Sequence, residues 1–247
     1  MTPPEILRTL VFGFPVIKEC LDTAWPIFIQ SLGGLMLSFF ITIGSLIGGA
    51  ILGMILALMR FTPVEEQAKR FRFRPVVLIG SSVEWFIRGL PIMIIVLLFN
   101  YLPFALFKLR VPGAILAVGA FSLYGGAYFS GVFLGGLRCV SSDLRNASRV
   151  LGLSSLQTLI HIRIPIAVRT MLPALLGITV TLFKDSSVLV VVAVPELMYT
   201  ARQMAFSSPS DYAPVLGTTL LLYWIIATMI SGLARLLEQH WDGAVSR

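Results

Sequence analysis

The sequence predicts an all-α membrane protein with about five transmembrane helices. Of its 247 residues, 57% are hydrophobic and only 13% are charged, and the mean hydropathy is +0.90. A soluble domain carries about 25% charged residues. Several uncharged stretches also exceed the roughly 20 apolar residues that a helix needs to cross the hydrocarbon core. A lipid-facing surface explains the scarcity of charge better than a large core does.

Five apolar segments can be placed in order along the chain. They are residues 31–59, 75–107, 111–137, 164–195 and 212–234. The second and fourth are longer than the minimum, so we expect them to be tilted or broken. The transmembrane domain then covers residues 31–237. An extracytoplasmic or interfacial segment (1–30) precedes it, and a cytoplasmic tail (238–247) follows it.

The positions of Lys and Arg predict the orientation. Outside the spans, basic residues are concentrated in two loops, residues 60–74 and 138–169, and a few more lie at the C-terminal end. This richer side should be cytoplasmic. An N-terminus outside and a C-terminus inside require an odd number of spans, which five satisfies. The same distribution argues against a nucleic-acid partner, because the basic residues flank apolar runs and form no solvated basic domain.

Glycine spacing favours close packing of the first and third spans. Small residues four positions apart let helix backbones approach each other in lipid. Three such pairs occur: Gly44 with Gly48, Gly49 with Gly53, and Gly131 with Gly135. Pairs of this kind are common in membrane helices of every function, so they indicate a helix bundle and nothing more specific.

A long loop, residues 138–165, joins the third and fourth spans. Candidate helix N-caps stand near its start, at Ser141, Ser142 and Asp143. Apolar residues then recur at helical spacing, at Leu144, Ala147, Val150, Leu151 and Leu153. Gly152 interrupts this pattern, and Pro165 opens the next span. The pattern predicts a short amphipathic helix on the cytoplasmic side, which from physics alone fits a docking element or a helix lying among lipid headgroups.

The same loop resembles the cytoplasmic loop of ABC importer permeases. Its residues Asn146, Ala147, Ser148, Gly152 and Ile162 to Pro165 match, without a gap, the family pattern Glu-Ala-Ala, Gly and Ile-x-Leu-Pro. The resemblance implies the type I, MetI-like permease fold, in which this coupling helix sits in a cleft of the ATP-binding subunit and transmits its movement. The contact residues that it implies are Asn146, Ala147, Ser148, Gly152 and Leu153, with Asp143 as a substitute for the family's Glu.

Other segments are similar to the polar amino acid branch of this family, and within it most to glutamate/aspartate permeases. They are Arg88 to Pro91, Ala127 with Tyr128, Leu182 to Ser187, and Pro195 to Leu197. The resemblance spans residues 35–241. It implies a location in the inner membrane of a bacterium and several partners: ATPase subunits that bind ATP, a second and different permease chain, and a periplasmic or surface-tethered amino-acid-binding protein.

Arg88, Lys184 and Asp185 are charged residues at membrane depth, and two of them, Arg88 and Asp185, are candidates for a substrate site. Each costs about 2.5 to 3.5 kcal/mol at the centre of a membrane helix, so such residues usually face a cavity or a partner. Arg88 can hold a carboxylate through two hydrogen bonds, and Asp185 can accept from an ammonium group.

Neighbouring residues complete the candidate substrate site. Gly89 and Pro91 should break the helix beside Arg88 and expose backbone groups, while Ser186 and Ser187 add hydroxyls. The alternative is that Arg88 and Asp185 pair with each other, or with Lys184 and Glu84, and only hold helices together.

The chain departs from the family pattern at several positions. Asn146 replaces the family's Glu, Asp143 and Leu144 replace Gly and Gln, and Gly131 and Leu134 replace a Glu and an Arg of the third span. Two alternatives therefore stay open: a permease half with its own substrate site, or the less active half of a heterodimer.

Motifs for catalysis are absent from the sequence. It has no Gly-x-x-x-x-Gly-Lys-Ser/Thr loop, so we expect ATP on a separate subunit and no cofactor or metal on this chain, which should not be an enzyme. An ion-coupled carrier working alone would be supported by an inverted repeat. A membrane enzyme would need paired carboxylates or metal ligands facing one cavity. The sequence shows neither, and the loop favours the importer.

Overall fold

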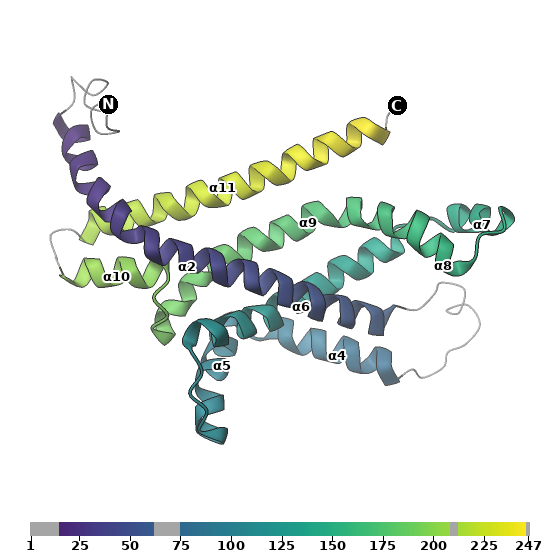
Figure 1. The fold of residues 1–247 in the computed structure, drawn as a ribbon, viewed down its shortest axis with the longest axis horizontal. Coiled ribbons are helices and arrows are strands. Elements are labelled where there is room, and N and C mark those ends of the chain that lie inside the picture. The colour runs from purple at the N-terminus through teal and green to yellow at the C-terminus, as the bar shows by residue number, and fades with distance from the viewer. Residues whose placement is uncertain (1–14, 62–74, 208–211, 246–247) are drawn as a thin grey trace.

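The computed structural model describes residues 15–61, 75–207 and 212–245, and these residues fold as an all-α bundle (Figure 1). The prediction of an all-helical chain is confirmed for these ranges. The α-helices are α2 (Pro15–Arg60), α4 (Pro75–Gly89), α5 (Ile92–Phe107), α6 (Gly113–Arg138), α7 (Ser142–Val150), α8 (Ser155–Thr158), α9 (Ile164–Asp185), α10 (Leu197–Ser207) and α11 (Tyr212–Val245). A π-helical turn, η1 (Leu159–Arg163), leads into α9, and a 3₁₀ segment, η2 (Ser186–Val192), follows it.

Four stretches of helix in the described residues are long and apolar enough to cross a membrane, and the pair α4–α5 makes five if it forms one bent span. The predicted number of spans is therefore confirmed. The first helix begins at Pro15, and its apolar part begins at Ala24. The helix thus runs through half of the segment expected at the interface, because helical hydrogen bonding continues beyond the apolar pattern that marks the lipid-embedded part.

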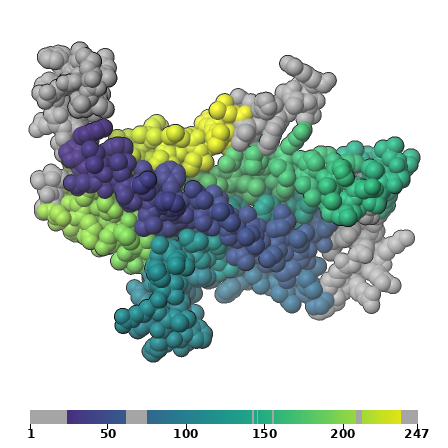
Figure 2. Space-filling view, viewed as in Figure 1, coloured from purple at the N-terminus to yellow at the C-terminus, as the bar shows by residue number. Residues whose placement is uncertain are grey.

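The predicted break in the second span is confirmed. Helices α4 and α5 meet at an angle of 101°. Pro91 ends the α-helical hydrogen bonding because it has no N–H group, and its backbone is extended, with φ −60° and ψ 134°. Ile95 and Val96 near the start of α5 are still buried in the core, and the far part of α5 projects from the bundle (Figures 1 and 2).

The fourth predicted span lies in one continuous helical stretch, Leu156–Val192, along which the helix type changes. Its α-helix ends at Asp185, the 3₁₀ segment η2 follows, and Ala193 then turns the chain with a left-handed φ of 56°. Helix α10 comes next and was not predicted from the sequence. The last helix, α11, begins at the expected residue, Tyr212, and continues into the segment expected as a tail.

Helices α2 and α6 pack closely through the glycines of α2. A Cβ atom on Gly53 would lie 2.8 Å from the carbonyl oxygen of Gly126, and one on Gly48 would collide with Ser122. The two predicted glycine pairs of the first span therefore have the packing role that their spacing indicates. The pair in the third span differs, because Gly131 faces Arg88 and Gly135 faces open space.

The end of α2, the end of α6 and the segment α7–η1 lie at one end of the bundle, and α10 lies at the other (Figure 1). Arg163 of η1 ties the first end together: it donates to the carbonyl of Leu137 at 2.9 Å, and its guanidinium stacks 5.0 Å from the ring centroid of Phe61. The positive-inside rule assigns this end to the cytoplasm. The basic residues expected between 62 and 74 lie outside the described residues.

Candidate functional site

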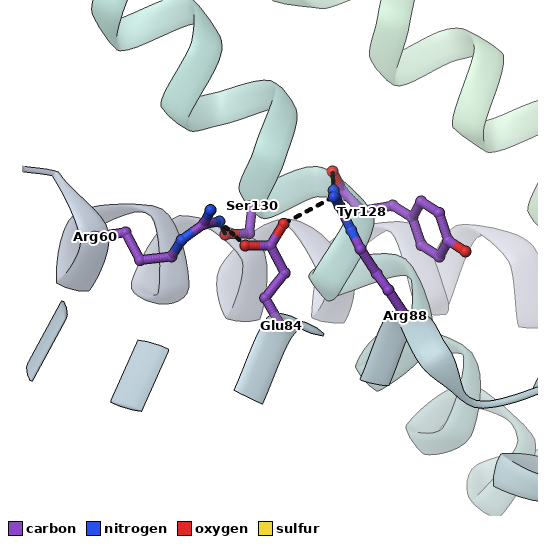
Figure 3. A network of polar contacts seen from close by, with 5 residues as sticks. All are labelled: Arg60, Glu84, Arg88, Tyr128 and Ser130. Carbon is purple, nitrogen blue, oxygen red and sulfur yellow. Dashed lines mark hydrogen bonds and ion pairs between the residues drawn. The ribbon is translucent and has the colours of Figure 1, made fainter. Parts of the chain in front are cut away.

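A buried carboxylate joins two arginines at the contact of α2, α4 and α6 (Figure 3). Glu84 is 4% exposed, and one of its oxygens lies 3.0 Å from Nη1 of Arg88, one helical turn further along α4. Its other oxygen pairs with the guanidinium of Arg60, the last residue of α2. The sequence left open whether Arg88 pairs with Glu84, and the structure shows that it does.

The third helix, α6, fixes both arginines from a second side. Nη2 of Arg88 donates to the carbonyl oxygen of Tyr128 at 3.3 Å, and the guanidinium lies 5.1 Å from the centroid of the Tyr128 ring. Arg60 donates to the Ser130 hydroxyl at 3.1 Å. These contacts hold the Arg88 guanidinium in place while 38% of its side chain stays exposed.

The exposed part of Arg88 lines a pocket of about 510 Å³. The other lining residues are Arg60, Ser81, Ser82, Glu84 and Trp85. Two guanidiniums and one carboxylate leave the pocket with one excess positive charge. Since two contacts use only part of the guanidinium's N–H donors, the pocket can bind a carboxylate through the remaining ones.

A pair of tyrosines connects Arg88 with the neighbourhood of Asp185. Tyr128 packs against Tyr124 with ring centroids 4.9 Å apart, and their hydroxyls lie 3.4 Å from each other. The half-buried Asp185 lies within electrostatic range of the Tyr124 hydroxyl. The ion pair recorded for Arg88 is with Glu84, and not with Asp185.

The remaining predicted substrate residues lie in different surroundings. Gly89 and Pro91 are exposed at the break beside Arg88. Ser186 is fully buried, and its hydroxyl donates to the carbonyl of Phe183 at 2.7 Å. Ser187 is half-buried. Of the predicted set, Arg88 lines the pocket, and Gly89 and Pro91 lie at the break that follows it.

The sequence arguments missed the central role of Glu196, which appeared only as part of a family resemblance. This carboxylate is fully buried at the start of α10. It accepts hydrogen bonds from the Tyr223 hydroxyl at 3.0 Å, from the Ser38 hydroxyl at 3.3 Å and from the backbone N–H groups of Met198 and Tyr199. It caps α10 and ties it to α2 and α11. A carboxylate directly before an apolar helical run was the available sequence signal.

The predicted coupling helix is present as α7. Its N-cap is Ser141, whose hydroxyl accepts from the N–H of Leu144 at 3.3 Å. Its C-terminal end is closed by Gly152 in a left-handed conformation, with φ 75°. The N–H of Gly152 donates to Arg149 and that of Leu153 to Ser148, at 2.9 and 3.0 Å. This pair of hydrogen bonds is the Schellman motif, which requires a residue with positive φ.

Most of the predicted docking residues lie at the surface of this segment. Asp143, Asn146, Ala147 and Gly152 are exposed, and Leu153 is half-buried. Ser148 is buried and accepts from the Thr158 hydroxyl at 3.1 Å, which braces α7 against α8. Two apolar residues at the end of α7 are the most exposed, Val150 at 88% and Leu151 at 77%.

These features define a class of protein: a multi-span membrane transport subunit. A broken span carries charged side chains into a pocket, as substrate sites of transporters do. A rigid, capped helix with exposed apolar side chains stands at the cytoplasmic end, where a partner can dock.

The chain belongs to the family of binding-protein-dependent transport system inner membrane components, whose model matches residues 49–243. It is 29% identical to the L-cystine transport system permease protein TcyB of Bacillus subtilis over 223 residues, which is 90% of each chain. It is 30% identical to the probable glutamine ABC transporter permease protein GlnP of the same organism, over 83% of this chain and 90% of the relative.

The other comparisons agree with this family. The glutamate/aspartate import permease protein GltK of Escherichia coli is 27% identical over 85% of this chain and 92% of its own length. Among solved structures, an amino acid ABC transporter crystallised with histidines superposes with a TM-score of 0.74 at 24% identity, over 85% of this chain and 94% of that one. The MetNI methionine ABC transporter superposes with a TM-score of 0.67 at 16% identity. The superposition covers 86% of this chain and 98% of that one. These structures establish the type I importer fold.

Proposed function

We propose that this chain is one permease half of an ATP-driven importer for polar amino acids in the inner membrane of a bacterium, with glutamate and aspartate as its preferred substrates. The relatives support the amino acid class, since they are named for cystine, glutamine and glutamate or aspartate. The pocket supports the preference within that class.

The observation that carries the substrate preference is the charge of the pocket beside the break in α4. Arg60, Glu84 and Arg88 together leave one positive charge, and Arg88 presents free N–H donors to the pocket. An acidic amino acid offers two carboxylates and one ammonium, so its net charge is opposite to that of the pocket. In this proposal Arg88 holds a carboxylate of the substrate.

The partners follow from the exposed segment around α7. Val150 and Leu151 are apolar and almost fully exposed at the cytoplasmic end, which is costly unless a partner covers them. We assign this surface to the ATPase subunit, which binds and hydrolyses ATP. A second, different permease chain completes the core, and a binding protein delivers the amino acid to the opposite side.

The test is ATP hydrolysis by the complex reconstituted in liposomes with its ATPase and binding protein. The panel is glutamate, aspartate, glutamine, cystine and arginine. Stimulation by glutamate and aspartate above the neutral and basic amino acids is expected. Stimulation by another class would reject the substrate preference, and no response to any amino acid would reject the importer function.

A further inference from the structure

The end of α2 touches both the pocket and the joint that follows α8. Arg60, the last residue of α2, pairs with Glu84 and lines the pocket. The ring centroid of the next residue, Phe61, lies 5.0 Å from the guanidinium carbon of Arg163 in η1. This π-helical turn joins the docking segment, α7 with α8 (residues 142–158), to the fourth span. Two neighbouring residues therefore connect the pocket with the segment assigned to the ATPase.

Arg163 fastens this joint to two other helices at once. Its Nη2 donates to the carbonyl of Leu137 at the end of α6, at 2.9 Å, while its guanidinium lies over the Phe61 ring. A planar guanidinium can make both contacts, because its N–H donors lie in the plane and its face stacks on the ring. The joint itself is a single π-helical turn, a feature that often occurs at functional sites. The joint therefore cannot shift without moving the ends of α2 and α6 or breaking these contacts.

On its other side, the end of α2 packs directly against α4. A Cβ atom built on Gly80 would lie 3.2 Å from Cβ of Met59 and 3.2 Å from Cγ of Arg60. Arg60 also donates to the Ser130 hydroxyl of α6 at 3.1 Å. Close packing of this kind transmits displacement, because it leaves no space to absorb it. A movement of the end of α2 must therefore reach the pairing of Arg60 with Glu84.

We propose that Arg163 and Phe61 carry movement of the docking segment to the pocket through the end of α2. This inference rests on the proposed function, in which the ATPase subunit binds the docking segment. The end of α2 has two arrangements: Arg60 paired with Glu84, as in this structure, or withdrawn from it when the ATPase shifts the joint. The substrate biases the same balance, because Arg88 shares the carboxylate of Glu84. An element with two arrangements that both sites bias is what coupling requires.

The alternative is that the contact between Arg163 and Phe61 only stabilises the cytoplasmic end. The docking segment also continues through η1 into α9, so movement could pass along that helix alone. The two possibilities predict different losses. A stabilising contact affects the unfolding midpoint, whereas a coupling contact affects the ratio of substrate-stimulated to basal ATP hydrolysis.

Variants at the two positions break or preserve the contact. Phe61→Leu removes the ring and leaves the hydrogen bond from Arg163 to Leu137 in place. Phe61→Tyr keeps a ring and is the conservative variant. Arg163→Met removes both contacts of the guanidinium. Arg169→Ala, which removes an exposed arginine near the start of α9, is the matched control.

The assay is ATP hydrolysis by the complex reconstituted in liposomes, with and without glutamate-loaded binding protein. Phe61→Leu and Arg163→Met should keep the ATPase bound and its basal hydrolysis intact, while the stimulation by glutamate falls about fivefold or more. Phe61→Tyr and Arg169→Ala should match the unaltered protein. Co-purification of the ATPase and the unfolding midpoint are measured for each variant.

A double variant ties the effect to this contact. Because Phe61→Leu and Arg163→Met remove the same stack, the double variant should lose no more stimulation than Arg163→Met alone. Multiplied losses, a lower midpoint with an unchanged ratio, or equal losses in Phe61→Leu and Phe61→Tyr would overturn the proposal. If Arg163→Met failed to assemble, Phe61→Leu alone would decide.

Failure of the proposed function is visible separately, in the unaltered complex. If another amino acid stimulated that complex in place of glutamate, the substrate preference would fail, and the same variants would be compared with that amino acid. If no amino acid stimulated it, the importer function would fail and the inference would fall with it.

Discussion

Glu84 and Arg88 lie one helical turn apart on α4, with a carboxylate oxygen 3.0 Å from Nη1, and the same carboxylate also pairs with Arg60 at the end of α2. One buried anion therefore fixes the arginine of the pocket to the cytoplasmic end of the first span. Removing it would leave two neighbouring guanidiniums without their carboxylate partner.

The first prediction concerns this buried carboxylate. Glu84→Gln should destabilise the subunit by roughly 1 to 3 kcal/mol, because both arginines lose their carboxylate partner while solvent screens the part-exposed Arg88. The measurement is the thermal unfolding midpoint of the purified subunit in detergent. Val83→Ala, an exposed neighbour on the same helix, is the control. An equal midpoint for Glu84→Gln and the unaltered protein would show that the network contributes nothing to stability.

The second prediction concerns the cap of α10. Tyr223→Phe removes the hydroxyl that donates to Glu196 at 3.0 Å. A hydrogen bond to a charged group contributes about 1.5 to 3 kcal/mol, so the unfolding midpoint should fall. Tyr199→Phe is a matched control, since the Tyr199 hydroxyl meets only the exposed Gln203 side chain at 2.9 Å. Equal midpoints for the two variants would contradict the role assigned to Glu196.

The third prediction concerns the end of the coupling helix. Gly152 has a φ of 75°, where a side chain costs about 1 to 2 kcal/mol. Gly152→Ala should loosen the Schellman turn and reduce co-purification of the ATPase subunit, with membrane insertion unchanged. Gly152→Asn should retain more of the ATPase, because Asn adopts this conformation more readily. If the Gly152→Ala variant co-purified with as much ATPase subunit as the unaltered protein, the Schellman turn would not be needed for docking.

The parts of the fold that could be predicted from the sequence depend on local signals. The length of the apolar stretches predicted the spans. Gly89 and Pro91 predicted the break before α5, and an N-cap residue followed by a glycine at the C-terminal end predicted α7. Each of these follows from a few neighbouring residues. The long start of α2 was missed because the apolar pattern marks only the part of a helix that lies in lipid.

The two polar networks were not predictable in the same way. Glu84 meets Arg60 across a loop, and Glu196 meets Ser38 and Tyr223 from helices far apart in the chain. Such contacts depend on how the helices pack, which neither periodicity nor motif spacing specifies. The sequence could identify Arg88 as unusual for a membrane span, but it could not choose among the partners available to it.

The fourth prediction addresses the central claim, that Arg88 holds the carboxylate of the substrate. Arg88→Lys keeps the positive charge but loses the planar fork that binds a carboxylate through two hydrogen bonds. Arg88→Ala loses both. Each variant should still co-purify with the ATPase, since the docking segment lies at the end of the bundle on other helices.

The most direct measurement is therefore glutamate-stimulated ATP hydrolysis by the reconstituted complex carrying Arg88→Lys, compared with the unaltered protein and with Arg88→Ala. The stimulation by glutamate should fall about tenfold or more in the Lys variant and vanish in the Ala variant, with the ATPase still bound. Stimulation that is unchanged in both variants would contradict the claim and would leave Arg88 as a structural partner of Glu84.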